Sequence, residues 1–229
     1  MALAQRGKSV LLVDMDPQGH LGEWFAYTSA TLEKEISAVL DTKLTLPDIL
    51  LPVRPKVDLA PSNIRLSYVE TVLYTKYRRE SRLKDALQSV QDRYDFILID
   101  CPPSLGVLTV NALSAAGSVL IPMACEYGSL LGAGLLLQTI DEIKAEINPS
   151  LTVRGIVVTR YTRTINAREI YERAKAELGE MVHIYPNAIP DTTRMREAFS
   201  LGKPLFEHDP DSPAAVAYQR LAEEVMAHG

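Results

Sequence analysis

The hydrophobic residues of the chain fall into short continuous runs that alternate with longer amphipathic segments. A short run that is apolar throughout is typical of a strand buried on both faces. Four such runs span residues 9–13, 96–99, 118–121 and 151–153 with 155–158, and weaker candidates span 57–59 and 182–184. Helical periodicity covers residues 81–92, 104–115, 128–147, 166–178 and 213–227. This alternation predicts the α/β class, with a doubly wound, mostly parallel sheet flanked by helices.

One region interrupts the alternation, between Thr28 and Pro61. Prolines such as Pro47 and Pro55 break any helical pattern there, and no Gly/Ser run flanks the region. We interpret it as a surface excursion rather than as a linker. The whole chain, residues 1–229, is therefore expected to form a single domain.

The composition is that of an ordinary globular protein. The 229 residues are 47% hydrophobic and 23% charged, with a net charge of −5, which excludes disordered, collagenous and disulfide-framework classes. The longest mostly apolar stretch is far below the roughly 18 residues of a membrane span. Residues 1–8 carry charge where a signal peptide is apolar, and the two cysteines, Cys101 and Cys125, fit a reducing compartment. These features predict a cytoplasmic protein without membrane contact.

Positive charge is concentrated locally despite the negative total. Residues 74–84 contain five basic side chains against one acidic, and residues 151–175 contain six against two. Such a cluster is compatible with a solvated helix face, and it is also compatible with a surface that faces phosphates. The pattern alone leaves both interpretations open.

Carboxylates follow two of the predicted strands. Asp14 and Asp16 end the first strand and precede Pro17 and Gly19. One aspartate there could simply cap a turn, but two in alternation favour a site for a metal and a phosphate. Asp100 closes a second apolar run in the Walker B arrangement. Parallel sheets bind ligands beyond the carboxyl ends of their strands, where these residues fall.

Several segments together resemble the ParA/MinD family of deviant-Walker ATPases, and ParA proteins in particular. The matching segments occur in the family's order and span residues 11–19, 59–63, 94–104, 119–127, 189–190 and 202–204. The resemblance implies a P-loop NTPase-like fold and a Mg²⁺-dependent ATPase that forms an ATP-sandwiched homodimer. It further implies nonspecific binding to DNA, a ParB-type partner protein, a role in plasmid or chromosome partitioning, and a nucleoid-associated cytoplasmic location.

The same resemblance implies roles for individual residues. Hydrolysis is expected to depend on Asp16, and Asp14 and Asp100 are expected to lie around Mg²⁺. The residues expected to border the adenine are Arg160, Pro190 and Asp191, and those expected to contact DNA are Arg163 and Arg194. Family members often have a basic residue at the position of Asp191, and this departure weakens the expectation of DNA binding.

The phosphate-binding loop is the largest departure from the family pattern. A P-loop reads G-x-x-x-x-G-K-[ST] between a strand and a helix, whereas Gly7-Lys8-Ser9 has Ala2 at the first glycine position and precedes a strand. Gly7 is better interpreted as the residue that ends a helix. The chain is therefore expected to be N-terminally truncated, without the family's first strand and P-loop, and unable to bind or hydrolyse ATP. A sheet without that strand is expected to expose unpaired edges.

Three explanations of this departure remain open: a start placed too far downstream, a natural loss of ATP binding, or a fragment that another chain completes. Whether the chain is itself an enzyme therefore stays open. The alternative function is a non-catalytic ParA-like module that binds or regulates DNA or a ParA-like partner. Two smaller expectations concern side chains: Asn166 caps the helix that follows it, and both cysteines are structural thiols.

Overall fold

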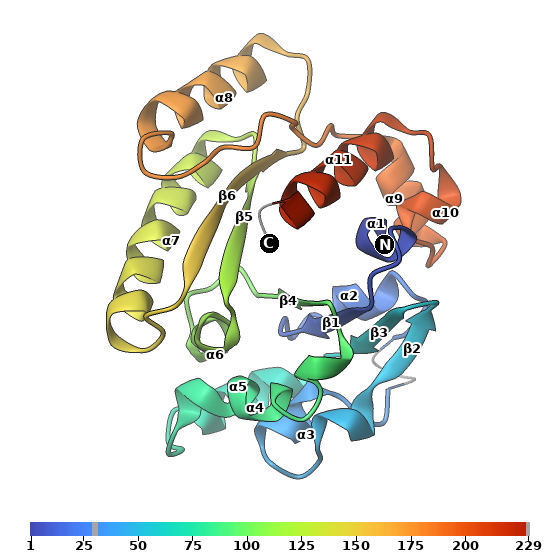
Figure 1. Ribbon diagram of the computed structural model, residues 1–229, viewed down its shortest axis with the longest axis vertical. Coiled ribbons are helices and arrows are strands. Elements are labelled where there is room, and N and C mark those ends of the chain that lie inside the picture. The colour runs from blue at the N-terminus through green and yellow to red at the C-terminus, as the bar shows by residue number, and fades with distance from the viewer. Residues whose placement is uncertain (29–31, 228–229) are drawn as a thin grey trace. The chain divides into compact units, whose positions relative to one another are not determined.

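The computed structural model describes residues 1–28 and 32–227. These form two compact units, each with a sheet of its own (Figure 1). Unit 1 consists of Met1–Ala116 and Ala198–Pro204, and unit 2 consists of Gly117–Glu197 and Leu205–Gly229. Neither unit is a continuous piece of chain. The expectation of a single domain stays a prediction.

Unit 1 contains a four-stranded sheet in the order β2-β3-β1-β4. β1 lies parallel to both β3 and β4, and β2 pairs antiparallel with β3 at one end of the sheet. The elements are, in chain order, α1 (Ala2–Gln5), β1 (Val10–Asp14), α2 (His20–Glu23), α3 (Ile36–Leu40), η1 (Leu46–Ile49), β2 (Leu51–Arg54), β3 (Val57–Ala60), α4 (Arg65–Leu73), η2 (Arg79–Ser81), α5 (Arg82–Leu87), η3 (Gln91–Arg93), β4 (Phe96–Asp100) and α6 (Val107–Ala115).

The core of unit 1 follows from the alternation of side chains along β1 and β4. Leu11 and Val13 point to one face, where Ile97 and Ile99 of β4 join them. The helices α3, α4, α5 and α6 lie along this face (Figure 1), and their apolar side chains belong to the same core. Since side chains of a strand alternate between faces, Asp14 lies on the opposite face from Val13.

β4 is paired along one edge only. Its partner is β1, and among the described strands none pairs with its other edge. Leu98 in the middle of this apolar strand is 43% exposed. The unpaired edge agrees with the expectation from the sequence.

The region from Thr28 to Pro61 contributes to the core, so its interpretation as a surface excursion was wrong for the residues described. Residues 29–31 lie outside them. Ile36, Leu40 and Leu46 are almost fully buried in the core of unit 1. Pro47 does not prevent this burial. It occupies the first turn of η1, behind a capping box formed by Thr45 and Asp48. The backbone N–H that proline lacks would have no partner within the helix at that position.

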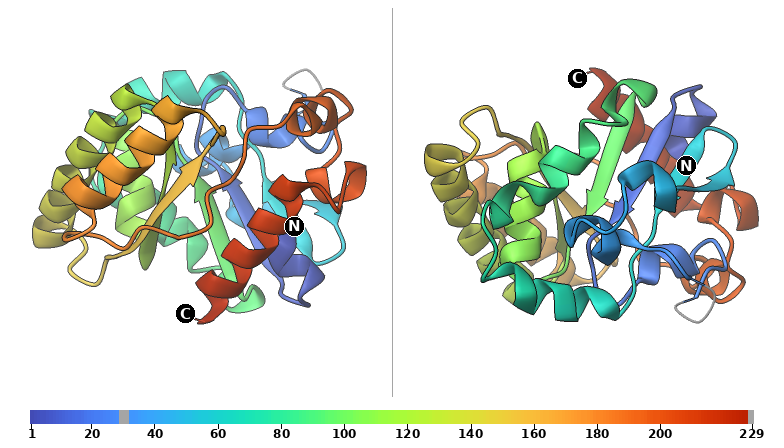
Figure 2. Two further views of the ribbon diagram at one scale, coloured as in Figure 1. Left: turned by 90° about the horizontal axis from the view of Figure 1, so that it is seen from above. Right: turned by 90° about the horizontal axis from the view of Figure 1, so that it is seen from below.

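Unit 2 is built on two parallel strands, β5 (Ser118–Ala124) and β6 (Thr152–Thr159). α7 (Tyr127–Glu146) and α8 (Ile165–Leu178) run along one face of this pair, and α11 (Pro213–Ala227) lies along the other (Figures 1 and 2). α10 (Leu205–His208) precedes α11, and α9 (Thr193–Ser200) crosses the boundary between the units. The weak strand candidate at 182–184 is reduced to an isolated bridge between Ile156 and Ile184.

The helix ends test two local predictions. Gly7 has a φ of 83°, its amide donates to the Ala4 carbonyl at 2.9 Å, and the amide of Lys8 donates to the Leu3 carbonyl at 3.2 Å. This is a Schellman motif, and it confirms Gly7 as the residue that ends a helix. The prediction for Asn166 was wrong, because the side chain of Thr164 caps α8 by accepting from the Ala167 amide at 3.2 Å.

The predicted fold class is confirmed. Parallel strands alternate with helices in both units, and only β2 runs antiparallel to its neighbour. None of the helices in the described ranges combines the length and apolarity needed to cross a lipid bilayer.

Candidate functional site

Two predicted magnesium ligands lie side by side in unit 1. Asp14 ends β1, Asp100 ends β4, and the two residues are direct partners in the parallel register. Partners in neighbouring parallel strands place their side chains on the same face of the sheet. The structure therefore brings Asp14 and Asp100 together at the carboxyl ends of adjacent strands.

Asp16 is held by the turn that follows β1. Its amide donates to Asp14 Oδ1 at 3.0 Å, and its own Oδ1 accepts from the Gln18 amide at 2.9 Å. Gly19 closes the turn with a φ of 70°, and a Cβ at this position would lie 2.8 Å from the Ser62 carbonyl oxygen. Only glycine fits such a close approach with that backbone angle. The turn thus keeps Asp16 next to Asp14.

The proximity of the carboxylates changes their acidity. Burial, and to a smaller extent the charges of Asp100 and Asp16, raise the pKa of Asp14 to about 7, although the Asp16 amide opposes this. Partial desolvation and the charge of Asp16 also raise the pKa of Asp100, while nearby His20 lowers it. Negative charge is thus costly here, and a cation would relieve that cost.

An unsatisfied oxygen tests whether this site suits a divalent cation. Asp14 is fully buried, and its Oδ2 has no hydrogen-bond donor among the described residues; nor does the buried Ser62 Oγ. Buried polar atoms without partners are rare. No cluster of three or more acidic, histidine or cysteine side chains in the described ranges could hold a metal by itself. Mg²⁺ characteristically uses one or two carboxylates with water and phosphate oxygens, so Asp14 and Asp100 fit it.

The two cysteines show no sign of nucleophilic function. Burial and the charges of Asp100 and Asp16 raise the pKa of Cys101 to about 12, so its thiol stays protonated. Cys125 is buried, and its thiol donates to the Ala167 carbonyl at 3.0 Å. Burial also raises its pKa. Both observations fit structural thiols.

The structure also brings together the three residues predicted to border adenine, all in unit 2. Arg160 directly follows β6 and has a φ of 53°, and the next residue, Tyr161, forms a bridge with Pro190. The amide of Asp191 donates to the Tyr161 carbonyl at 3.0 Å. Glu126, at the end of β5, pairs with Arg160 at 3.2 Å. The ion pair itself was not predicted, although both residues follow strands that are now seen to be adjacent.

The two residues predicted to contact DNA have different surroundings in unit 2. Arg194 donates to Glu197 at 2.9 Å and lies 3.4 Å from Asp209, and His208 approaches the same Glu197 oxygen at 3.2 Å. Arg163 is exposed in the segment between β6 and α8, and among the described residues no ion pair involves it. A phosphate would have to compete with two carboxylates at Arg194 but not at Arg163.

Sequence reasoning missed Ser62 and Arg196 near these sites. Ser62 lies within the matched segment 59–63, so the motif could have pointed to it, but its burial depends on the turn at Gly19. Arg196 approaches Asp191 at 3.5 Å. The sequence did not indicate this contact, because Asp191 lies outside α9, the helix that contains Arg196.

Comparison with known proteins shows which family the chain resembles. The family described as "AAA domain" matches residues 1–153. The sporulation initiation inhibitor protein Soj of Bacillus subtilis is 40% identical over 229 residues, covering 99% of this chain and 90% of Soj. The chromosome partitioning protein ParA of Caulobacter vibrioides is 37% identical over 230 residues, covering 99% of this chain and 85% of that protein.

A solved structure extends the similarity to three dimensions. Cobyrinic acid a,c-diamide synthase from Mycobacterium smegmatis, solved with a bound ATP analog and magnesium, matches with a TM-score of 0.86 and 32% identity. The match covers 99% of this chain and 85% of that chain. The family match over more than half of the sequence and the relatives of this identity and coverage show that the chain belongs to the ParA/MinD family of ATPases.

Proposed function

We propose that this protein is a ParA-type ATPase that partitions DNA, either a chromosome or a plasmid, in the cytoplasm. The observation that supports it most is the pairing of Asp14 and Asp100 at the ends of β1 and β4, with one buried carboxylate oxygen left without a partner. The similarity to relatives named for chromosome partitioning also supports the proposal.

The roles of the site residues in unit 1 follow from this proposal. Mg²⁺, when bound, would neutralise the charge of nucleotide phosphates. Asp14 and Asp100 would hold that ion, directly or through water. Asp16 would orient the attacking water, because the Gln18 amide fixes one carboxylate oxygen and leaves the other available. Ser62 Oγ is a further donor at the same end of the sheet.

The remaining roles are proposals for unit 2 and for the assembly. Arg160, Pro190 and Asp191 would border the adenine, and Arg163 and Arg194 would contact DNA. A homodimer with ATP between its subunits, and a ParB-type partner that stimulates hydrolysis, complete the proposed cycle.

The polypeptide of these 229 residues contains no G-x-x-x-x-G-K-[ST] motif. The loop supplies most phosphate contacts through backbone amides at a helix N-terminus, and the remaining carboxylates repel ATP. We propose that this polypeptide alone does not bind ATP measurably. Isothermal titration with ATP and Mg²⁺ should show no binding, and micromolar affinity would overturn this part of the proposal.

The alternative function is a non-catalytic module that binds DNA or a ParA-like partner. Translating the genomic DNA upstream of Met1 in frame separates the two functions. A K-G-G-x-G-K-[ST] motif there supports the ATPase. A stop codon without that motif supports the module.

If the motif is encoded, the complete gene product should hydrolyse ATP in the presence of Mg²⁺. Asp16→Ala should then lower kcat by about 100-fold or more. Asp92→Ala, which removes an exposed carboxylate from η3, serves as the control and should retain full activity. Equal activity of both variants would contradict the role of Asp16.

DNA binding is tested separately by a gel shift at low salt. Arg163→Glu should weaken the shift more than Arg194→Glu, because two carboxylates already engage Arg194. Both effects should diminish as salt is raised. No shift of the wild-type protein at low salt would contradict the DNA-binding part of the proposal.

A further inference from the structure

The connection between α4 and α5 concentrates positive charge on unit 1. We call residues 74–84 the basic segment. It holds five basic side chains, Lys76, Arg78, Arg79, Arg82 and Lys84, against one carboxylate, that of Glu80. The chain as a whole has a net charge of −5, so this local excess opposes the overall balance. The candidate site residues lie elsewhere in the sequence.

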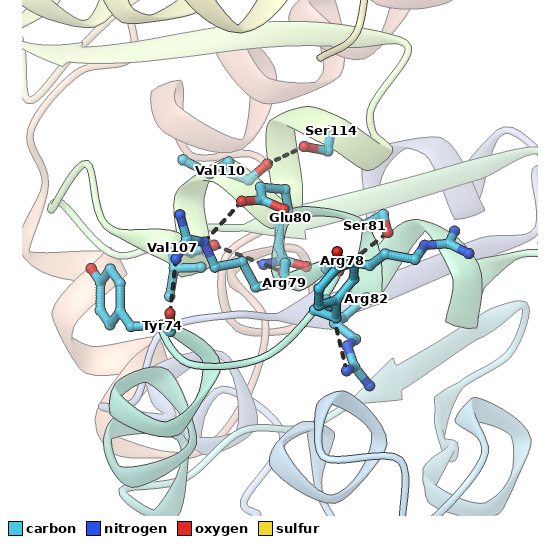
Figure 3. Close-up of polar contacts among 11 residues, drawn as sticks. Tyr74, Arg78, Arg79, Glu80, Ser81, Arg82, Val107, Val110 and Ser114 are labelled. Carbon is cyan, nitrogen blue, oxygen red and sulfur yellow. Dashed lines mark hydrogen bonds and ion pairs between the residues drawn. The ribbon is translucent and has the colours of Figure 1, made fainter. Parts of the chain in front are cut away.

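Two arginines of the basic segment shape its backbone (Figure 3). Arg79 donates through Nε to Glu80 Oε1 at 2.8 Å and through Nη1 to the Tyr74 carbonyl at 2.8 Å. Arg82 donates through Nη2 to the Tyr77 carbonyl at 3.1 Å. The bonds to Tyr74 and Tyr77 satisfy backbone carbonyls of the connection that no helical hydrogen bond satisfies. The segment therefore has a defined shape.

A buried asparagine of α6 anchors the same segment. Asn111 is fully buried, its Nδ2 donates to the Arg79 carbonyl at 2.7 Å, and its Oδ1 accepts from the Leu83 amide at 3.2 Å. The anchor holds the segment at two points on either side of Arg82. A surface that is already ordered loses less conformational entropy when it binds a ligand.

The anchored segment presents aromatic rings and cations to solvent. Tyr77 is 93% exposed, and Tyr68 on α4 is 73% exposed. Lys76 and Lys84 are exposed, and within the described ranges neither takes part in an ion pair. Two positive charges and two large exposed rings are thus available to a ligand.

A neighbouring lysine enlarges this surface beyond the segment. Lys43 pairs with Asp41 at 2.7 Å. The hydrogen bond from Lys43 and, to a smaller extent, the positive charges of Lys43, Lys76 and Arg82 lower the pKa of Asp41. α3, which precedes Asp41 and Lys43, packs against α4 and α5 in the core of unit 1. The surface therefore extends from the basic segment to the residues that follow α3.

This combination of groups fits a nucleic acid better than an acidic peptide. Cations attract either ligand. Exposed tyrosines can also stack on bases and donate hydrogen bonds to phosphates, and only a nucleic acid contains both bases and phosphates. Arg194, by contrast, is already engaged by two carboxylates. Within the described ranges, Lys76 and Lys84 form no ion pair with a carboxylate.

We propose that Lys43, Tyr68 and the basic segment form a nucleic-acid-binding surface on unit 1, with Lys76 and Lys84 contacting phosphates and Tyr77 contacting bases or sugars. The identification of the ligand as DNA rests on the proposed function. The surface is additional to the contacts proposed for Arg163 and Arg194.

Fluorescence anisotropy with labelled single- and double-stranded DNA of random sequence tests the surface in the full chain. Reversing the charge of Lys76 and Lys84 together should weaken binding to both DNAs at least tenfold. It should also lower the slope of log K against log salt by about 2 for double-stranded DNA. Tyr77→Ser should weaken single-stranded binding about tenfold. The control, Lys34→Glu with Lys144→Glu, makes the same change in net charge and should have under threefold effect. Circular dichroism verifies that each variant is folded.

Three outcomes would overturn the proposal, and they differ in which other conclusions they would contradict. If Arg163→Glu abolishes DNA binding while the Lys76/Lys84 variant binds as wild type, only this surface is wrong. If the wild-type protein binds no DNA at low salt, the DNA-binding part of the proposed function fails as well. If polyglutamate binds in a manner that depends on Lys76 and Lys84 while DNA does not, the surface recognises an acidic protein instead.

Discussion

At the scale of single residues, the buried carboxyl of Asp14 links stability to pH. Its pKa is about 7 in the folded protein, against 3.8 for an unperturbed aspartate. The unfolded chain thus loses this proton near pH 4 and the folded chain near pH 7. Between these values the folded state binds the additional proton, so stability falls as the pH rises. The full loss, reached above pH 7, is about 4 kcal/mol.

Replacing this residue isolates the effect. Asp14→Asn keeps an oxygen that accepts from the Asp16 amide and removes the titration. We expect it to stabilise the protein by a few kcal/mol at pH 8 and to change stability little at pH 4. Urea denaturation at several pH values measures both. A variant as stable as wild type at pH 8 would show that Asp14 is ionised without penalty.

The residues of the carboxylate site were predictable because they follow strands. The last residue of a strand lies at its carboxyl end, where a parallel sheet binds ligands. The sequence therefore predicted that Asp14 and Asp100 lie close together. Arg194 could not be understood in this way. One of its partners, Asp209, lies beyond α9 along the chain, and only tertiary structure brings the two together.

At the scale of elements, Gly155 allows the segment after α8 to approach β6. The Ile156 amide donates to the His183 carbonyl at 2.8 Å, and the Tyr185 amide donates to the Ile156 carbonyl at 2.9 Å. A Cβ on Gly155 would lie 2.6 Å from that His183 oxygen and 2.9 Å from the Tyr185 ring. Any side chain would therefore push a backbone segment away.

Gly155→Ala should destabilise the protein by about 1–3 kcal/mol, the usual cost of forcing atoms into a filled space. Gly117→Ala is a matched control, since no atom lies within 4 Å of the added Cβ. Thermal unfolding of both variants makes the comparison. If they unfold at the same temperature, the close approach at Gly155 does not contribute to stability.

Element prediction succeeded for three long helices with one buried face and failed for a short strand with little burial. α7, α8 and α11 have apolar residues at helical spacing, and the predicted boundaries lie within one residue of those observed. β2 was missed, because Val53 is the one buried residue among its four and Pro52 resembles a turn signal. The structure tolerates that proline because β2 is an edge strand.

At the scale of the whole molecule, the sequence could not reveal the two units because they do not follow chain order. Residues 198–204 return to unit 1 after the chain has formed most of unit 2. They are held there by aromatic packing of Phe199 on Trp24, with ring centroids 5.0 Å apart. Gly202 packs directly against Ala26. No local sequence pattern predicts that the chain returns to unit 1.

This connectivity leads us to expect that the units unfold together. The segment 198–204 is joined at both ends to unit 2 and packed into unit 1. We therefore expect that unfolding of either unit destabilises the other. Asn111→Leu weakens unit 1, because two buried backbone groups lose their partner at about 1–3 kcal/mol each. Gly155→Ala weakens unit 2. In a single cooperative transition, either variant lowers the midpoint reported by every probe.

The chain offers a probe for this experiment. Trp24 is the one tryptophan and lies in unit 1, so its fluorescence follows that unit, while far-ultraviolet circular dichroism follows the helices of both. Under single-domain behaviour, Gly155→Ala shifts the Trp24 transition as far as the dichroism transition. If Gly155→Ala leaves the fluorescence midpoint in place and Asn111→Leu moves it, the units are independent domains, and the single-domain prediction is wrong.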